Sequence, residues 1–345
     1  MLEKIKFKAK KILIAKGIIK IKKNSSPIKW GIIGLGNMAE VLASTIDGNK
    51  NAIVHAVASR SLLKATAFAN RHGKCKTYGS YEEMIHDSEI HLDIIYIATP
   101  VILHYEILKT CLLAGKNVIC EKPITTNSKQ FNDLIEIAKQ NNCFLMEAMW
   151  MKCLPTFQKA FEWINEEKIG NLELIKADFY KNEHKNPEST IYNSKEGGGV
   201  LLDYGIYAIS FMTTFLKGVP ETLNFSKRIS TLGVDSDWQI STKNKNVNAF
   251  INISSNFSSQ SKAALIGEKG SIEWDSQFNR THKITLFDAF GNKIEEYASR
   301  YVYQGFEFEV DEVTRCLKDL KKESQLVPLN ETLDTLTVID QLISK

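Results

Sequence analysis

The sequence predicts an α/β domain with a doubly wound parallel sheet, followed by an α+β domain with an open-faced, mostly antiparallel sheet. Three observations lead to this prediction. A chain of 345 residues is long enough for two domains. A glycine-rich turn, GLGNMA, follows an apolar strand and opens a run in which strand and helix patterns alternate up to about residue 150. Beyond that point, strand patterns follow one another with turns between them.

The first 150 residues read as strands that end in turns and lead into helices. The segment LDIIYIATP is almost entirely apolar, which is typical of a strand buried on both faces of a sheet. SLLKATAFANRHG has a helical pattern that ends at Gly73. We therefore expect strands at 28–34, 52–59, 92–100, 116–123 and 143–149, with a short one near Thr77. We expect helices from the glycine turn to about Asp47, at 61–73, from Ser80, at 101–115 and at 127–141.

The pattern changes after Trp150. We expect a helix at about 155–168, a strand with alternating residues at 171–180, and a glycine-led amphipathic helix in GGGVLLDYGIYAISFMTTFLKG. Strands fill 221–298, with turns at KNKN, GEKG and AFGN, and helices at about 306–322 and 331–344 complete the chain. The predicted divisions are an N-terminal extension over 1–27, a first domain over 28–150, a second domain over 151–330 and a C-terminal helix over 331–345.

The composition is that of a soluble globular protein, with 43% hydrophobic and 24% charged residues. The six cysteines form no Cys-x-x-Cys pair, so we expect reduced thiols in a cytoplasmic protein. The seven histidines have no spacing typical of metal ligands, so we expect no metal site.

The net charge of +4 is unevenly distributed. Residues 1–29 hold ten lysines and one acid, Glu3, so the rest of the chain has 34 basic and 39 acidic residues. This mildly acidic body argues against nucleic-acid binding. Residues 1–23 contain no uninterrupted apolar run of a signal peptide or a membrane span. Their lysines, isoleucines and leucines fit either a helix in weak contact with an anionic membrane surface or a solvated arm.

The turn GLGNMA has the Gly-x-Gly-x-x-Gly/Ala pattern of a dinucleotide-binding loop. Gly34 would make the turn from strand to helix, and Gly36 would leave room for a pyrophosphate against the backbone. The small Ala39 would let the helix pack on the sheet, with Asn37 and Met38 at the helix N-terminus, where free N–H groups attract phosphate. The alternative is a tight turn without a ligand, but the strand before it and the helix after it favour binding.

The second strand ends in ASRS, where an acidic residue would favour a free ribose 2′-hydroxyl. Ser59 and Arg60 instead offer a hydroxyl and a guanidinium, and a guanidinium suits a 2′-phosphate. We therefore expect NADP(H) rather than NAD(H). The alternative is an arginine that only faces solvent.

Three later strands end in ATP, CEKP and MEAMW. In a doubly wound sheet the ligand lies beyond the carboxyl ends of the strands, so Thr99, Pro100, Glu121 and Lys122 are expected to face the cleft where a nicotinamide would lie. Pro123 would fix the turn out of its strand, with a cis or a trans bond before it.

Hydride transfer at an alcohol carbon also needs a group that exchanges a proton with the oxygen. Asp203 and Tyr207 are four residues apart and would share one face of a helix. A neighbouring ammonium, that of Lys122, would lower the pKa of the Tyr207 phenol. We interpret Tyr207 as proton donor and acceptor, Lys122 as its electrostatic partner and Asp203 as orienter. The alternative is a tyrosine that anchors the helix through Asp203. The glycines at 197–199 would permit close approach of the backbone to a ligand.

These motifs resemble those of the glucose–fructose oxidoreductase/inositol dehydrogenase (Gfo/Idh/MocA) family, from about residue 28 to the C-terminus. EAMWMKCLP is similar to the dimeric dihydrodiol dehydrogenase-like branch. The resemblance implies a Rossmann domain, here the expected NADP-binding domain over 28–150, an open-faced sheet domain for substrate and oligomerisation, and the catalytic residues Lys122, Asp203 and Tyr207. The motifs that carry it, in order, are GLGNMA, ASR, ATP with His104, AGKNVICEKP, EAMW, GGGVLLDYGIYAI and GEKGSI.

The expected cofactor-binding residues share the loops that follow the strands, and are Gly34, Gly36, Asn37, Met38, Ser59, Arg60, Thr99, Pro100, His104, Glu121 and Lys122. Two departures from the family pattern stand out. Val101 replaces a common Asn, which puts one polar contact in doubt, and Lys152 replaces a common Arg, which puts a substrate contact in doubt.

The sequence therefore predicts an NADP(H)-dependent oxidoreductase that acts on a secondary alcohol or carbonyl of a sugar, a cyclitol or a dihydrodiol. The expected partners are a small polyol-like or sugar-like substrate and further copies of the chain, as a homodimer or homotetramer formed through the sheet domain. The alternative is a non-catalytic regulator of the same fold that binds nucleotide and sugar.

Overall fold

The computed structural model describes residues 26–183, 190–193 and 197–344. The predicted basic extension, and with it the expected contact of residues 1–23 with a membrane surface, falls almost entirely outside the described residues. Within the described ranges, no helix is long and apolar enough to cross a membrane. All six cysteines are described and unpaired.

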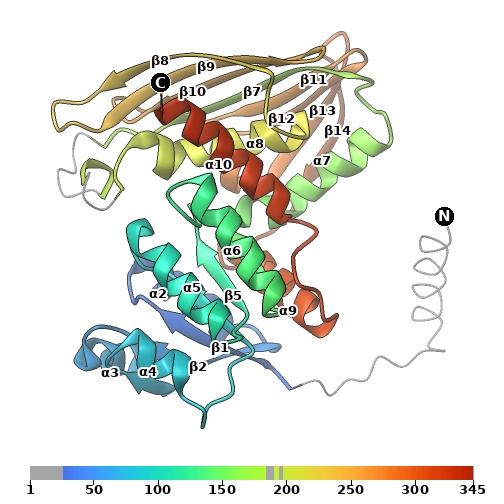
Figure 1. The fold of residues 1–345 in the computed structure, drawn as a ribbon. Helices are drawn as coiled ribbons and strands as arrows, with labels where there is room; N and C mark the ends of the chain where they lie inside the picture. The colour runs from blue at the N-terminus through green and yellow to red at the C-terminus, as the bar shows by residue number, and fades with distance from the viewer. Residues whose placement is uncertain (1–25, 184–189, 194–196, 345) are drawn as a thin grey trace, which may run out of the picture.

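The first domain has a six-stranded parallel sheet in the order β3-β2-β1-β4-β5-β6. It lies below the second domain in the view of Figure 1. The predicted doubly wound class is confirmed, because helices follow each strand and the strand order reverses between β1 and β4. The strands are β1 Ile28–Ile33, β2 Ala52–Ala58, β3 Lys76–Tyr78, β4 Ile94–Ile97, β5 Val118–Glu121 and β6 Leu145–Ala148. The helices are α2 Asn37–Asp47, α3 Leu62–Arg71, α4 Tyr81–His86, α5 His104–Leu113 and α6 Ser128–Gln140.

The helices of this domain begin in different ways, and the difference bears on function. The side chain of Ser61 caps α3 by accepting a hydrogen bond from the Lys64 N–H, and Asn127 caps α6 in the same way at Gln130. Helix α2 begins after Gly36 and has no side-chain cap. Its first N–H groups are therefore available to a ligand.

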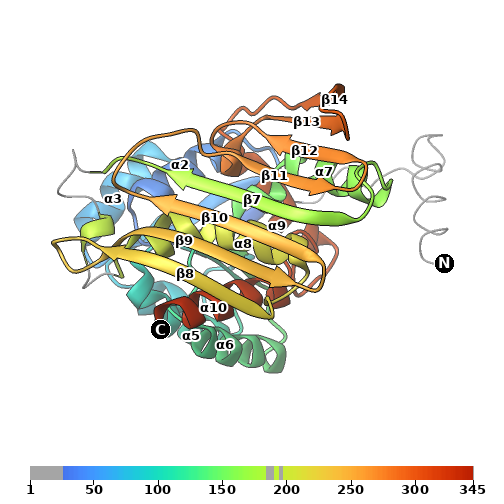
Figure 2. The ribbon, with the colours of Figure 1, turned by 90° about the horizontal axis from the view of Figure 1, so that it is seen from above.

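The second domain has an eight-stranded sheet in the order β14-β13-β12-β11-β7-β10-β9-β8. All neighbouring strands are antiparallel except β7 and β10, so the predicted mostly antiparallel sheet is confirmed. Figure 2 shows its outer face with no helix over it. The strands are β7 Leu172–Tyr180, β8 Thr222–Ile229, β9 Asp235–Asn244, β10 Val247–Ser254, β11 Ala263–Gly267, β12 Gly270–Trp274, β13 Lys283–Asp288 and β14 Lys293–Ala298.

Helix α8, Ile206–Leu216, lies under the inner face of this sheet. The prediction of an amphipathic helix is wrong here, because every residue of α8 is buried. The reason is that α8 packs against β7 and β10 on one side and against the C-terminal helix α10, Leu329–Ile343, on the other. A helix covered on two sides has no polar face.

The C-terminal helices return to the first domain and join it to the second. Helix α9, Phe306–Lys318, packs on α2, and α10 packs on α6 as well as on α8. The Leu145 N–H at the start of β6 donates to the Lys322 carbonyl (3.1 Å). A further helix, α7 Pro155–Asn165, starts with proline at its first turn, a position where a missing N–H is tolerated.

Candidate functional site

A cleft of about 790 Å³ lies between the strand ends of the first sheet and the inner face of the second. The first domain contributes its phosphate turn and the ends of β4 and β5, and the second contributes β7, the turn before α8 and the segment around residue 280. Most of the residues predicted from the sequence line this cleft, namely Gly36, Asn37, Met38, Thr99, Pro100, Glu121, Lys122, Asp203 and Tyr207.

The phosphate turn has the geometry that a dinucleotide requires. Gly34 has a φ of 84°, and a Cβ there would lie 2.7 Å from the Ala98 carbonyl oxygen at the end of β4. Only glycine fits this position. A Cβ on Gly36 would meet no atom within 4 Å. The space beside Gly36 and the uncapped start of α2 therefore fit a pyrophosphate.

Ser59 and Arg60 follow β2, next to this turn, since the Gly34 N–H donates to the Ala58 carbonyl (3.3 Å). Ser59 is buried, and its hydroxyl accepts a hydrogen bond from the Ser61 N–H (3.3 Å). Arg60 is exposed. Within the part of the chain that the structure describes, no carboxylate lies within 4.0 Å of its guanidinium. An exposed, uncommitted guanidinium at this place fits a 2′-phosphate.

The structure brings together the three residues predicted to be catalytic. The Lys122 ammonium donates to the Asp203 carboxylate (2.7 Å) and to the Asp203 carbonyl (2.8 Å). The same ammonium lies 5.1 Å from the centre of the Tyr207 ring. Lys122 belongs to the loop after β5, whereas Asp203 lies in a π-helical turn, Leu201–Gly205, that leads directly into α8. The Lys122–Pro123 bond is cis.

The Tyr207 hydroxyl is held by a residue that the sequence prediction missed. It accepts a hydrogen bond from the Trp150 indole N–H (3.0 Å), and the Trp150 ring stacks on Phe306 at 4.6 Å between centres. Asp203 pairs with Lys122, so the alternative of an anchoring bond from Tyr207 to Asp203 does not apply. Among the described residues, no acceptor takes the proton of the Tyr207 hydroxyl. The phenol can therefore donate that proton into the cleft.

The Lys122 ammonium acts on the pKa of Tyr207 in the predicted direction, but the pKa does not fall below its usual value. Burial raises the pKa of Tyr207 to about 12, and the opposing effect of the Lys122 ammonium is smaller. Burial would lower the pKa of Lys122, but Asp203 and Tyr207 raise it above its usual value. At neutral pH the site therefore holds a protonated phenol beside a charged ammonium.

Two of the predicted cofactor-binding residues are held by the protein itself. Glu121 accepts a hydrogen bond from the Tyr96 hydroxyl (2.5 Å), and burial raises the pKa of its carboxyl. The ring of His104 is buried away from the cleft, with its nitrogens 2.7 Å from the Thr99 carbonyl and 2.9 Å from the Pro123 carbonyl. His104 is not one of the residues that line the cleft, and it joins the loops that follow β4 and β5.

A second tyrosine next to Tyr207 also escaped the sequence prediction. The Tyr204 hydroxyl donates to Glu183 and accepts a hydrogen bond from the Lys181 ammonium (2.8 Å). The Phe179 ring is stacked with both tyrosines, at 5.2 Å from Tyr204 and 5.9 Å from Tyr207. Two sequence patterns could have predicted this group. Tyr204 and Tyr207 are three residues apart in DYGIY, so they lie on one side of a helix, and the alternation in β7 directs Phe179 to one face of its sheet.

The glycines at 197–199 pack closely against the protein, and Gly197 and Gly198 also line the cleft, so a close approach of the backbone to a ligand stays a prediction. A Cβ on Gly197 would lie 2.6 Å from Val101, and one on Gly199 would lie 2.1 Å from the Asp235 carboxylate. A Cβ on Gly198 would lie 2.7 Å from two main-chain carbonyl oxygens. The side chain of Val101 therefore packs where this glycine segment crosses the loop after β4.

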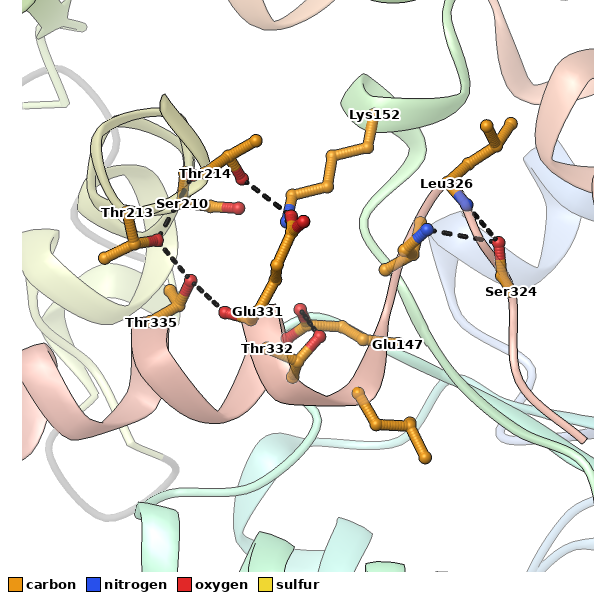
Figure 3. A network of polar contacts seen from close by, with 12 residues as sticks. Glu147, Lys152, Ser210, Thr213, Thr214, Ser324, Leu326, Glu331, Thr332 and Thr335 are labelled. Carbon is orange, nitrogen blue, oxygen red and sulfur yellow. Dashed lines mark hydrogen bonds and ion pairs between the residues drawn. The ribbon is translucent and has the colours of Figure 1, made fainter. Parts of the chain in front are cut away.

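Lys152 lies behind the cleft and is not one of its lining residues. Its side chain is 1% exposed, and its ammonium forms an ion pair with Glu331 of α10 (2.8 Å). Thr214 of α8 donates to the same carboxylate (3.0 Å), as Figure 3 shows. Lys152, where the sequence left a substrate contact in doubt, instead contacts Glu331. Through Glu331 it connects the segment after Trp150 to α8, the helix that carries Tyr207.

The same helix, α10, also supports the loop of Lys122. Glu147 at the end of β6 accepts hydrogen bonds from the Ile124 N–H (3.1 Å) and from the Thr332 hydroxyl (3.3 Å). Figure 3 shows Thr332 and Glu331 side by side on α10, directed to Glu147 and to Lys152. One helix therefore supports the elements that carry Lys122, Trp150 and Tyr207.

Comparison with known proteins identifies the family. A model of the oxidoreductase family with an NAD-binding Rossmann fold, GFO_IDH_MocA, matches residues 28–149, and a model of the GFO/IDH/MocA C-terminal domain matches residues 157–273. The chain belongs to the Gfo/Idh/MocA oxidoreductase family. The predictions that the chain resembles this family and that it is an oxidoreductase are confirmed.

Relatives specify the branch, and solved structures share the fold. Trans-1,2-dihydrobenzene-1,2-diol dehydrogenase of Xenopus laevis is 32% identical over 328 residues, which are 92% of this chain and 97% of that protein. The human protein of the same name is 29% identical and covers 88% of this chain and 92% of its own. KijD10, a 3-ketoreductase from Actinomadura kijaniata solved with NADP and TDP-benzene, has a TM-score of 0.80 at 21% identity, over 92% of this chain and 98% of its own. Aldose–aldose oxidoreductase from Caulobacter crescentus has a TM-score of 0.80 at 19% identity, over 92% and 97%.

Replacing Glu331 with Gln should destabilise the protein, because the Lys152 ammonium would stay buried without a charged partner. Breaking a buried pair in this way costs about 3–5 kcal/mol, and we expect about 2 kcal/mol here because the Glu331 side chain is 27% exposed. Chemical denaturation measures the free energy of unfolding. Lys152→Met is the matched control and should cost less, since Glu331 can turn to water. Equal stability of Glu331→Gln and the wild type, or a larger loss in Lys152→Met, would contradict this account.

Proposed function

We propose that this protein is an NADP(H)-dependent oxidoreductase that transfers a hydride between nicotinamide and a secondary alcohol or carbonyl of a sugar, a cyclitol or a dihydrodiol. The observation that carries the proposal is the placement of Tyr207, which lines the cleft, has no acceptor for its hydroxyl proton among the described residues, and has its ring centre 5.1 Å from the Lys122 ammonium. The names of the relatives, which are diol dehydrogenases, support the substrate class.

The cofactor part of the proposal rests on the phosphate turn and on Arg60. The space at Gly36 and the N–H groups of α2 would hold the pyrophosphate, and Arg60 would bind the 2′-phosphate of NADP(H) in preference to NAD(H). Thr99, Pro100 and Glu121 line the cleft beyond the strand ends, where the nicotinamide would lie. When bound, the nicotinamide supplies or accepts the hydride.

The protein's own residues handle the proton. In the direction of reduction, Tyr207 donates its proton to the oxygen of the carbonyl group. The Lys122 ammonium stabilises the phenolate that forms, and Asp203 holds the ammonium in place. Trp150 donates to the phenol oxygen in both protonation states, since an indole N–H is a donor only. In the direction of oxidation, the same groups act in reverse.

We also propose a cytoplasmic homodimer or homotetramer that forms through the outer face of the eight-stranded sheet. This face has no helix over it in Figure 2, and Phe250 of β10 is 49% exposed on it. A sheet face that no helix covers is available for contact with a second copy of the chain. Sedimentation of the full chain as a monomer at all concentrations would contradict the proposal.

Replacing Tyr207 with Phe tests the assignment of the proton donor. Turnover should fall by about 10²- to 10⁴-fold, because the variant has no group to exchange the proton. NADPH binding, measured by fluorescence, should change little, since the hydroxyl contacts only Trp150 among the described residues. Tyr204→Phe is the matched control and should retain more of the turnover. An unchanged kcat in Tyr207→Phe would remove this residue from its role and favour the regulator alternative.

Replacing Arg60 with Ala tests the choice of cofactor. NADPH binding should weaken by about tenfold or more, the effect of losing a hydrogen bond to a charged group, while NADH binding should hardly change. Calorimetric titration with both cofactors gives the two ratios. Lys50→Ala, an exposed cation at the opposite end of β2, is the control and should change neither. If Arg60→Ala weakened the binding of NADPH and NADH equally, Arg60 would not be the residue that recognises the 2′-phosphate.

A further inference from the structure

The active-site cleft opens into a second hollow of about 700 Å³ that the proposed function does not explain. Gln277, Arg280 and Gln304 line both spaces and form the threshold between them. The hollow lies in the second domain, between the segment that joins β12 to β13 and the segment before α9. A ligand that reacts at Tyr207 and is longer than one sugar ring would pass this threshold.

Two of the three threshold residues have a left-handed backbone conformation, Gln277 with a φ of 60° and Gln304 with a φ of 58°. Residues other than glycine are uncommon in this conformation and persist only where the surrounding structure holds them. Such positions concentrate at binding and catalytic sites. Both glutamines present amide groups that can donate and accept hydrogen bonds.

Neighbouring residues hold both glutamines in place. Phe278 is buried among aromatic rings, and its N–H donates to the Ser261 carbonyl (2.9 Å). The Glu307 carboxylate accepts hydrogen bonds from the N–H groups of Val302 (2.6 Å) and Gly305 (3.0 Å), on either side of Gln304. The threshold is therefore ordered before any ligand arrives, which lowers the entropic cost of binding.

The hollow is positively charged. Lys262, Arg280 and Lys283 line it with a single acid, Asp275, which is paired with Lys283 (3.0 Å). In the described ranges, neither Lys262 nor Arg280 has a carboxylate within 4.0 Å. The Arg280 guanidinium binds the side-chain oxygen of Gln277, which aligns it along the threshold. Two cations without counterions attract an anion.

An amide at the cleft end of the threshold is open to a ligand. Asn279 is 7% exposed and lines the active-site cleft. Its side-chain polar atoms are not among the buried atoms that lack a partner in the described part of the chain, so they remain accessible from the cleft. The amide can therefore donate to and accept from a polar ligand that runs between the two spaces.

We propose that the substrate is a phosphorylated carbohydrate whose phosphate binds at Arg280 and Lys262, while its hydroxyl groups bind Asn279 and the two threshold glutamines. The inference rests on the proposed function, because it places the reacting carbon at Tyr207. A phosphate ester carries close to two negative charges and several acceptor oxygens, so it matches a guanidinium, an ammonium and amide N–H groups together. A sugar phosphate and a nucleotide-linked sugar share this chemistry.

Calorimetric titration of the full chain saturated with NADP⁺ tests the proposal, because the filled cofactor site takes no further phosphate. Glucose-6-phosphate or UDP-glucose should bind at least about tenfold more tightly than glucose, the gain expected from a charge-assisted hydrogen bond. Tighter binding of glucose-6-phosphate identifies a free sugar phosphate, and tighter binding of UDP-glucose identifies a nucleotide-linked sugar. Equal binding of all three, or no binding of either phosphorylated probe, would overturn the proposal.

The variant Arg280→Gln/Lys262→Gln should remove this preference and leave NADP⁺ affinity unchanged. Arg228→Gln/Lys269→Gln, two exposed cations of the same domain outside both spaces, should keep the preference. A preference that survives in Arg280→Gln/Lys262→Gln would also overturn the proposal. Because the readout is binding, this result is separate from NADPH oxidation, which tests the proposed function itself.

Discussion

The contact between Lys122 and Asp203 is the interaction on which the site depends. It joins the loop after β5 of the first domain to the π-helical turn before α8 of the second, through a bond of 2.7 Å to the carboxylate and one of 2.8 Å to the carbonyl. Because both acceptors belong to one residue, the ammonium is fixed relative to α8 and hence to the Tyr207 ring 5.1 Å away. A cleft between two domains becomes a site for proton transfer only when such a contact sets the distance between the groups on its two sides.

The surrounding structure holds each side of this contact separately. His104 connects the loops after β4 and β5, and Glu147 holds the main chain at Ile124, just beyond Lys122. On the other side, the ion pair of Lys152 and Glu331 ties α8 to the segment of Trp150. Helix α10 takes part on both sides, so the last element of the chain supports groups that come from three earlier segments.

Most of the fold and the three grouped side chains could be predicted from the sequence, because their signals are local. Gly34 and Gly36 lie in one turn, and Lys122 ends an apolar strand. The missed features depend on contacts between distant segments. Burial of α8 arises from a sheet and a helix on its two sides, the pKa of Tyr207 follows from burial that no motif encodes, and Trp150 reaches Tyr207 across 57 positions of sequence. The threshold of Gln277 and Gln304 likewise forms only in the folded chain.

The most direct test of the account is the pH dependence of alcohol oxidation, measured as kcat/KM, in the wild type and in Lys122→Met. In the proposed mechanism the base in this direction is the Tyr207 phenolate; burial raises the pKa of the phenol to about 12, and Lys122 opposes that rise. We expect log(kcat/KM) to rise by about one unit per pH unit in both proteins below the pKa, with the variant lower throughout and its plateau displaced to higher pH. Equal kcat/KM in the two proteins across this range, or a plateau at the same pH in both, would show that the ammonium does not act on the phenol.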